Sequence, residues 1–225
     1  MRKIELARLG TAIAAGVFSL AVVLVVAPAA QALNITGSLG SAADNCGTYE
    51  PTDPSPHTFM VGDSITAGGK ADLAVLRPGW EINARAGRNV DCLAMLVSGR
   101  LEHGYLGRLV IALGTNAVRG WDQDDYQAVQ AMVPSGTTVL FVSTYRDRVL
   151  WPSTNPYRTR AAVQYFYSGE MGEVAAARPH TCVVPWRPYA LKHPGMLRDG
   201  VHPTLAGRES WASLIDHAAR TCGAE

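Results

Sequence analysis

Two short segments, far apart in the chain, contain the residue types needed for nucleophilic catalysis. In the first, Gly62-Asp63-Ser64-Ile65, a serine follows an apolar run and lies on a tight turn. In the second, Asp199 precedes His202 by three residues, so its carboxylate can reach the imidazole Nδ1. The imidazole Nε2 then remains able to take a proton from a serine, as a Ser-His-Asp relay requires. Taken alone, each segment is equally typical of an ordinary turn or surface loop.

Two further segments offer hydrogen-bond donors. Gly87 lies in Ala-Gly-Arg-Asn (86–89), and a glycine lets a backbone N–H approach a ligand closely. Asn116 ends Gly-Thr-Asn (114–116) and supplies a side-chain amide. Either segment could also be a simple turn. Their joint placement, each just after a predicted strand, favours a shared functional site.

The elements that must position these residues alternate along the chain. Apolar runs predict strands, and amphipathic or capped segments predict helices. Strands separated by helices imply a parallel sheet with helices on both faces, and functional residues gather at the carboxyl ends of such strands. The predicted strands are 58–61, 81–85, 108–113, 137–143 and 181–184, and the predicted helices are 71–76, 89–97 (with Asn89 as cap), 122–133, 156–177 and 204–220.

These motifs together resemble the SGNH hydrolase superfamily, the GDSL-type esterases. The resemblance extends over residues 57 to about 217 and implies a flavodoxin-like three-layer α/β/α sandwich with a central five-stranded parallel sheet. By the same resemblance, Ser64 is the nucleophile, His202 the general base and Asp199 the residue that orients it. The oxyanion hole would consist of the Ser64 and Gly87 backbone N–H groups and the Asn116 side-chain amide.

A narrower resemblance is to the extracytoplasmic SGNH domains of peptidoglycan O-acetyltransferases. It includes the segment after the fourth predicted strand, which contains Tyr145, Arg146 and Trp151. These side chains could form a substrate-binding lip beside the active site, with arginine available for a carboxylate or phosphate. The alternative is an ordinary loop whose aromatic side chains pack against the domain.

Composition excludes several classes of protein. The chain has 225 residues, 48% of them hydrophobic and 17% charged, and a formal net charge of +1. This length fits one ordinary domain or at most two small ones, and the apolar content argues against general disorder. A nearly neutral chain has no broad basic face for phosphates, so no nucleic-acid partner is expected.

The amino-terminal residues predict export. Residues 1–32 combine a basic start, an apolar run and Ala30-Gln31-Ala32, a small-x-small cleavage site, which together are typical of a signal peptide. The alternative is an uncleaved membrane anchor. Residues 33–56 are rich in Gly, Ser, Asp and Pro and predict an N-terminal arm, and residues 57–225 form the hydrolase domain. We therefore expect a secreted or extracytoplasmic protein of the cell envelope.

The cysteines are consistent with that location. An even number of cysteines in an exported chain favours two disulfides, for which three connectivities exist, and the alternative is that the thiols are free. We favour Cys46–Cys92, which would tie the arm to a nearby helix, and Cys182–Cys222, which would tie the last helix to the last strand. No cysteine or histidine pair has zinc-ligand spacing, so neither a metal nor a cofactor is expected.

The predicted function is hydrolysis of small acyl esters by a secreted serine esterase. The substrate would be a small acyl ester or an acylated glycan, most simply an acetyl group on a cell-envelope carbohydrate, and the protein would act as a monomer. Two alternatives remain. One is an O-acyltransferase that moves the acyl group onto envelope glycan, with a membrane protein as acyl donor. The other is a non-catalytic glycan-binding module.

Overall fold

The computed structural model describes residues 45–52, 56–116, 121–147 and 161–223 of the chain. The predicted signal peptide (1–32) and Trp151 lie outside the described residues. No helix in the described part of the chain is both long and apolar enough to cross a bilayer.

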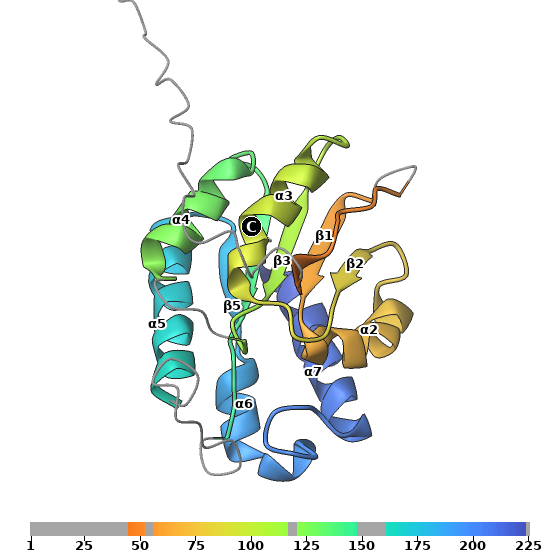
Figure 1. Ribbon diagram of the computed structural model, residues 1–225, viewed down its shortest axis with the longest axis vertical. Coiled ribbons are helices and arrows are strands. Elements are labelled where there is room, and N and C mark those ends of the chain that lie inside the picture. Colours follow the sequence, from red (N-terminus) through yellow and green to blue (C-terminus); the bar gives the residue numbers. More distant parts are fainter. Residues whose placement is uncertain (1–44, 53–55, 117–120, 148–160, 224–225) are drawn as a thin grey trace, which may run out of the picture. The chain divides into compact units, whose positions relative to one another are not determined.

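The core of the fold is a five-stranded parallel sheet with strand order β2-β1-β3-β4-β5 (Figure 1). This order is that of flavodoxin-like folds and confirms the predicted fold class. β1 is buried along its whole length, as expected for a strand covered on both faces. The strands are β1 (Thr58–Gly62), β2 (Glu81–Ala84), β3 (Arg108–Ala112), β4 (Thr138–Val142) and β5 (Thr181–Val184).

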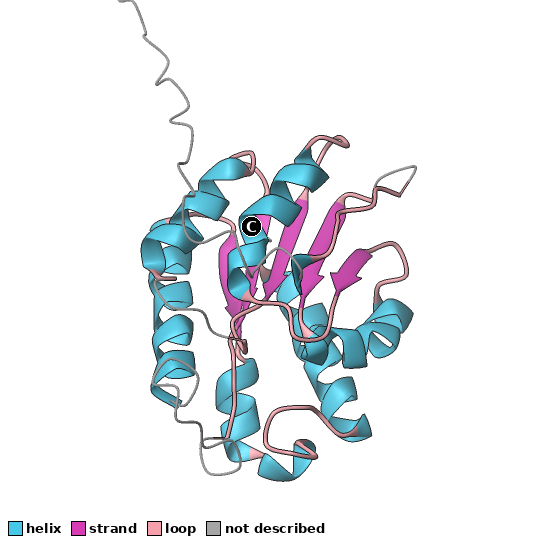
Figure 2. Ribbon diagram, viewed as in Figure 1, coloured by secondary structure: helices cyan, strands magenta, loops and turns pink. Residues whose placement is uncertain are grey.

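Helices cover both faces of the sheet, which gives three layers (Figure 2). Successive strand residues point to opposite faces, so Phe59 and Met60 belong to different apolar clusters. One face is covered by α2 (Ser64–Leu76), α6 (Trp186–Lys192) and α7 (Leu205–Thr221). The other is covered by η1 (Val90–Cys92), α3 (Leu93–Leu101), α4 (Gln123–Met132) and α5 (Ala161–Ala177), and η2 (Pro194–Met196) follows α6.

The helix predicted to begin at residue 71 begins at Ser64 instead. Gly68 and Gly69 lower helix propensity and obscure this start in the sequence. Tertiary packing overrides that preference: a Cβ on Gly69 would lie 2.8 Å from the Trp211 ring, so the missing side chain lets α2 approach α7 closely.

Two other helical elements differ from the sequence prediction. The helix expected over 89–97 consists of η1 and α3, and Asn89 occupies the cap position of η1 without a side-chain cap hydrogen bond. α6 was not predicted because it is short and contains Pro188. Proline is tolerated there because it lies in the first helical turn, where its missing N–H would have no intrahelical partner.

Both predicted disulfides are present. Cys46–Cys92 joins the arm to η1, and Cys182–Cys222 joins β5 to the end of α7. The described part of the arm packs against the domain, because Cys46 is only 5% exposed and the Tyr49 ring meets Phe59 edge-on at 5.6 Å. The segment 45–52 is therefore part of the folded unit.

Candidate active site

Two of the predicted site residues, Ser64 and Asn116, follow β1 and β3, which are neighbours in the sheet. β1 pairs with β2 along one edge and with β3 along the other, so the order of the strands reverses direction at β1. In sheets of this order, ligands bind at the carboxyl ends of the strands beside this point. Ser64 comes two residues after β1, and Asn116 comes four residues after β3.

Ser64 is the first residue of α2, so its backbone N–H has no hydrogen-bond acceptor within the helix. The preceding Asp63 is the helix cap, and its Oδ1 accepts a hydrogen bond from the Ile65 N–H at 2.9 Å. The first N–H groups of a helix have no intrahelical acceptor and point toward the positive end of the helix dipole. The Ser64 N–H can therefore donate to a negatively charged oxygen formed beside its own side chain.

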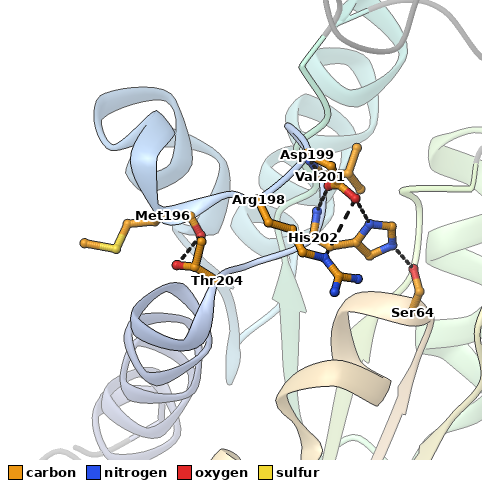
Figure 3. Close-up of polar contacts among 7 residues, drawn as sticks. All are labelled: Ser64, Met196, Arg198, Asp199, Val201, His202 and Thr204. Carbon is orange, nitrogen blue, oxygen red and sulfur yellow. Dashed lines mark hydrogen bonds and ion pairs between the residues drawn. The ribbon is translucent and has the colours of Figure 1, made fainter.

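Ser64, His202 and Asp199 form a continuous chain of polar contacts (Figure 3). The Ser64 Oγ lies 2.9 Å from the His202 Nε2, and the His202 Nδ1 lies 2.8 Å from the Asp199 Oδ2. Both ring nitrogens are thus engaged in the order that a Ser-His-Asp relay uses. The histidine side chain is 25% exposed, so the site is open to solvent and to a substrate.

The loop that carries Asp199 and His202 is fixed by its own hydrogen bonds. Asp199 Oδ1 accepts from the backbone N–H groups of Val201 at 3.1 Å and His202 at 2.7 Å. Burial alone would raise the pKa of Asp199, but these bonds and the bond to the His202 ring outweigh it and lower the pKa below the usual value. Asp199 is therefore held as a carboxylate facing the imidazole.

A second attachment links this loop to the segment after β4. The backbone N–H of Asp147 donates to the Gly200 carbonyl at 2.7 Å. The loop is also closed on itself, because the Arg198 N–H donates to the His202 carbonyl at 2.9 Å. The position of His202 thus depends on contacts from outside its own loop.

Gly87 lies in a tight turn directly beside the end of β1. The turn closes with a hydrogen bond from the Arg88 N–H to the Arg85 carbonyl at 3.2 Å, and Gly87 has a φ of +75°. A positive φ at the third residue of such a turn favours glycine. The Arg85 N–H donates to the Gly62 carbonyl at 3.2 Å, which attaches this turn to the strand that leads to Ser64.

Asn116 is attached to the same turn. Its side-chain amide donates a hydrogen bond to the Arg88 carbonyl at 3.1 Å. An amide nitrogen carries two N–H groups, and this contact uses one of them. The structure therefore places Asn116 against the turn that contains Gly87, and that turn is hydrogen-bonded to the end of β1.

Asp63 is a buried carboxyl group immediately before Ser64. It is 1% exposed, and burial raises its pKa to about 6, although hydrogen bonds from Ile65 and Thr115 and the charges of His202 and Arg146 oppose this shift. A small cavity next to it has room for about one water molecule. Asp63, Thr115, Thr144 and Trp186 are among the residues that line this cavity.

The expected substrate lip is described only in part. Tyr145 is half-buried and packs against the apolar cluster beneath α6 and α7, which matches the alternative of an aromatic residue packed on the domain. Arg146 is half-buried and close enough to Asp63 to lower the pKa of that carboxyl group. Trp151 is outside the described residues.

The potential metal ligands that cluster in the described residues do not form a metal site. Cys46, Asp91 and Cys92 bring ligand atoms within 4.8 Å of one another. The two sulfurs are joined in a disulfide, so neither can serve as a thiolate ligand.

Sequence reasoning did not assign a role to Arg88, Asn83 or Asn45, all of which contact the glycine turn or the strands beside it. The sequence contained one signal, an arginine directly after the glycine of the turn. A single arginine in a polar segment is normally expected to be exposed to solvent, whereas Arg88 is only 2% exposed.

No protein-family model matches the chain, and a search of curated proteins finds no match. Solved structures do resemble it. The C-terminal catalytic domain of peptidoglycan O-acetyltransferase A from Streptococcus pneumoniae, solved with a methylsulfonyl adduct, has a TM-score of 0.63 at 23% identity, over 73% of this chain and 93% of that one.

Two further structures have the same fold. A GDSL-like lipase from Bacteroides thetaiotaomicron has a TM-score of 0.57 at 17% identity, over 80% of this chain and 95% of that one. A lipase/acylhydrolase from Enterococcus faecalis has a TM-score of 0.52 at 18% identity, over 72% of this chain and 95% of that one. At these identities the likeness establishes the fold, and the expected resemblance to SGNH and GDSL-type proteins is confirmed at that level.

Proposed function

We propose that this chain is an exported serine esterase that hydrolyses small acyl esters, with acetyl groups on cell-envelope carbohydrate as the substrate class. The observation that carries the proposal is the chain of contacts from the Ser64 Oγ through the His202 ring to Asp199, at 2.9 and 2.8 Å. A serine held at hydrogen-bond distance from an oriented imidazole is an activated nucleophile.

In the first step, the Ser64 Oγ attacks the ester carbonyl carbon while the His202 Nε2 takes the hydroxyl proton. The carbonyl π bond opens and its electron pair moves to oxygen. The Ser64 N–H, the Gly87 N–H and the Asn116 amide are the donors for this oxyanion. One such donor typically contributes about 3 to 4 kcal/mol to transition-state stabilisation.

In the second step, the tetrahedral intermediate collapses and the bond to the alcohol oxygen breaks. His202 gives its proton to the departing alcohol, and an acyl-Ser64 ester remains. A water molecule then attacks this ester while His202 again takes a proton, and a second collapse releases the carboxylic acid and restores Ser64. Asp199 stays ionised throughout and stabilises the imidazolium.

An O-acyltransferase is the second candidate, and one observation favours it. The solved structure that matches with a TM-score of 0.63 is the catalytic domain of a peptidoglycan O-acetyltransferase. In that reaction a sugar hydroxyl, instead of water, would attack the acyl-Ser64 ester. The acyl group would then come from a separate donor, which for an envelope glycan would be a membrane protein.

The expected location and partners belong to the same proposal. Two disulfides suit an oxidising compartment, and cleavage of residues 1–32 would deliver the domain there. The boundaries of the arm (33–56) and of the hydrolase domain (57–225), action as a monomer and the absence of a nucleic-acid partner likewise remain proposals.

The direct test compares wild-type protein with Ser64→Ala and His202→Ala in hydrolysis of an aryl acetate. We expect the serine variant to lose turnover and the histidine variant to retain only a small fraction of it. Mass spectrometry of protein treated with a sulfonyl fluoride should show one adduct on Ser64 and none in Ser64→Ala. Wild-type turnover in the serine variant would refute the esterase.

The two enzymatic candidates differ in their products. With an acetyl donor and a chitooligosaccharide acceptor, an esterase releases acetate, whereas a transferase forms acetylated sugar. Acceptor acylation faster than acetate release would replace the first candidate by the second. If Ser64 reacts with neither probe nor substrate, the remaining reading is a glycan-binding module without catalysis.

A further inference from the structure

The arm before the domain contacts the turn that carries Gly87. The Asn45 side-chain amide donates a hydrogen bond to the Gly87 carbonyl, and this amide would lie 3.1 Å from a Cβ at Gly87. The Cys46 carbonyl accepts a hydrogen bond from the Arg88 Nε at 3.1 Å. Two consecutive arm residues thus hold two consecutive residues of the turn.

The Arg88 guanidinium extends this attachment to the central strands. Its Nη1 donates to the Gly62 carbonyl at 3.2 Å and to the Asn83 carbonyl at 2.8 Å, and its Nη2 donates to the Asn83 Oδ1 at 2.8 Å. The side chain is buried, and this burial lowers its pKa from the usual value. A buried guanidinium needs such acceptors, and loss of Arg88 would remove its hydrogen bonds to the Cys46, Gly62 and Asn83 carbonyls.

A disulfide keeps the arm in this position. Cys46 is bonded to Cys92 in η1, which begins two residues after Arg88. The covalent bond and the hydrogen bonds of Asn45 and Arg88 therefore act on the same short stretch of chain. Without the disulfide, hydrogen bonds and the packing of Cys46 and Tyr49 would have to keep the arm on the turn.

We propose that Asn45, Arg88 and the Cys46–Cys92 disulfide are positioning elements of the oxyanion hole, which fix the Gly87 turn relative to Ser64. This inference rests on the proposed esterase function. None of the three touches the reacting atoms. They act by holding the peptide that follows Gly87, and with it the orientation of the Gly87 N–H. A displacement of about 1 Å in such a site can cost about 100-fold in rate.

The second disulfide provides a matched control. Cys182–Cys222 joins residues 40 apart in sequence, and Cys46–Cys92 joins residues 46 apart. In the chain-entropy model, loops of such similar length contribute nearly equal stability. The control disulfide joins β5 to the end of α7, and no residue of the proposed oxyanion hole is in either element.

The experiment compares Cys46→Ser/Cys92→Ser with Cys182→Ser/Cys222→Ser in Tm and in kcat and KM for an aryl acetate. We expect similar losses of Tm in both. Only the first variant should lose kcat, by about 10- to 100-fold, with a smaller change in KM. Hydrogen exchange should accelerate at the backbone amides of residues 85–88 in the first variant alone.

A third variant leaves both disulfides intact. Asn45→Ala removes one hydrogen bond to the Gly87 carbonyl and should lower kcat by about 10-fold while Tm changes little. Normal kcat in Asn45→Ala and in Cys46→Ser/Cys92→Ser, beside active wild-type protein, would overturn the positioning role alone. Equal losses of kcat in both disulfide variants would also overturn it. Absence of Ser64-dependent hydrolysis in the wild type would overturn the proposed function together with this inference.

Discussion

The Asn116 side-chain amide donates a 3.1 Å hydrogen bond to the main-chain carbonyl of Arg88. This bond joins the segment after β3 to the turn that follows β2, so it links the two segments that contain the proposed oxyanion donors Asn116 and Gly87. β1, which leads to Ser64, lies between these two strands in the sheet. The segments that contain Gly87 and Asn116 therefore flank the strand that leads to Ser64.

Replacement of Asn116 by alanine removes one proposed donor and this attachment. We expect Asn116→Ala to lower kcat by about 100- to 1000-fold, the usual cost of losing one oxyanion-hole donor. Initial rates with an aryl acetate provide the measurement, and sulfonyl-fluoride labelling of Ser64 controls for an intact nucleophile. A turnover equal to that of the wild type would remove Asn116 from the site.

Asp199→Asn tests the orientation of His202. The amide can still accept hydrogen bonds from the Val201 and His202 N–H groups, but it carries no charge to stabilise an imidazolium. We expect kcat to fall by at least about 100-fold, because the corresponding change in a Ser-His-Asp triad is strongly inactivating. Circular dichroism should be unchanged. A loss below threefold would show that Asp199 serves the loop and not the chemistry.

Asp63 makes the stability of the protein depend on pH. Its pKa is about 6 in the folded protein, whereas an aspartate exposed to water has a pKa of about 3.8. Between these values the folded state binds more protons than the unfolded state, so the free energy of unfolding falls as pH rises through this window. For Asp63 this loss amounts to about 3 kcal/mol by about pH 7.

In Asp63→Asn, the amide oxygen can still accept the hydrogen bond from the Ile65 N–H, but the side chain cannot ionise. Urea unfolding at about pH 4, 5, 6 and 7 should therefore show the wild type losing stability relative to this variant as pH rises. Taking the difference between the two proteins cancels other titrating groups. Parallel curves over the whole range would mean that Asp63 titrates as an ordinary exposed carboxyl.

Gly68 and Gly69 are adjacent in α2 but should respond in opposite ways to alanine. A Cβ at Gly69 would lie 2.8 Å from the buried Trp211 ring, whereas at Gly68 it would meet only the Arg208 Cδ at 4.0 Å. We expect Gly69→Ala to cost about 1 to 3 kcal/mol by overpacking. Gly68→Ala should gain up to about 1 kcal/mol from helix propensity. Thermal unfolding of the pair checks both, and equal shifts would contradict the close α2–α7 contact.

Much of the fold was predictable because the sheet is parallel and buried. Strands covered on both faces consist of short, uninterrupted apolar runs, such as residues 109–112 of β3, and these are easily recognised. Ser64, Asp199 and His202 were predictable because the relay needs particular residue types, and because the strand ends of such a sheet converge at one edge.

The remainder depends on contacts between distant residues. Arg88 can be buried because carbonyl groups of Cys46, Gly62 and Asn83 accept its hydrogen bonds. No local sequence pattern predicts that these acceptors surround it. The start of α2 was predicted at the wrong residue because Gly69 is favoured there by its close packing against Trp211, which is far along the chain. In both cases a local preference was overridden by tertiary packing.

Ser64 and His202 are 138 residues apart in sequence, yet their side chains meet. Any compact intermediate that retains its helices but lets these two ends drift apart, as a molten globule does, would be enzymatically silent. Turnover of this protein would therefore report on tertiary order, and during denaturation it should disappear before the far-ultraviolet signal of the helices.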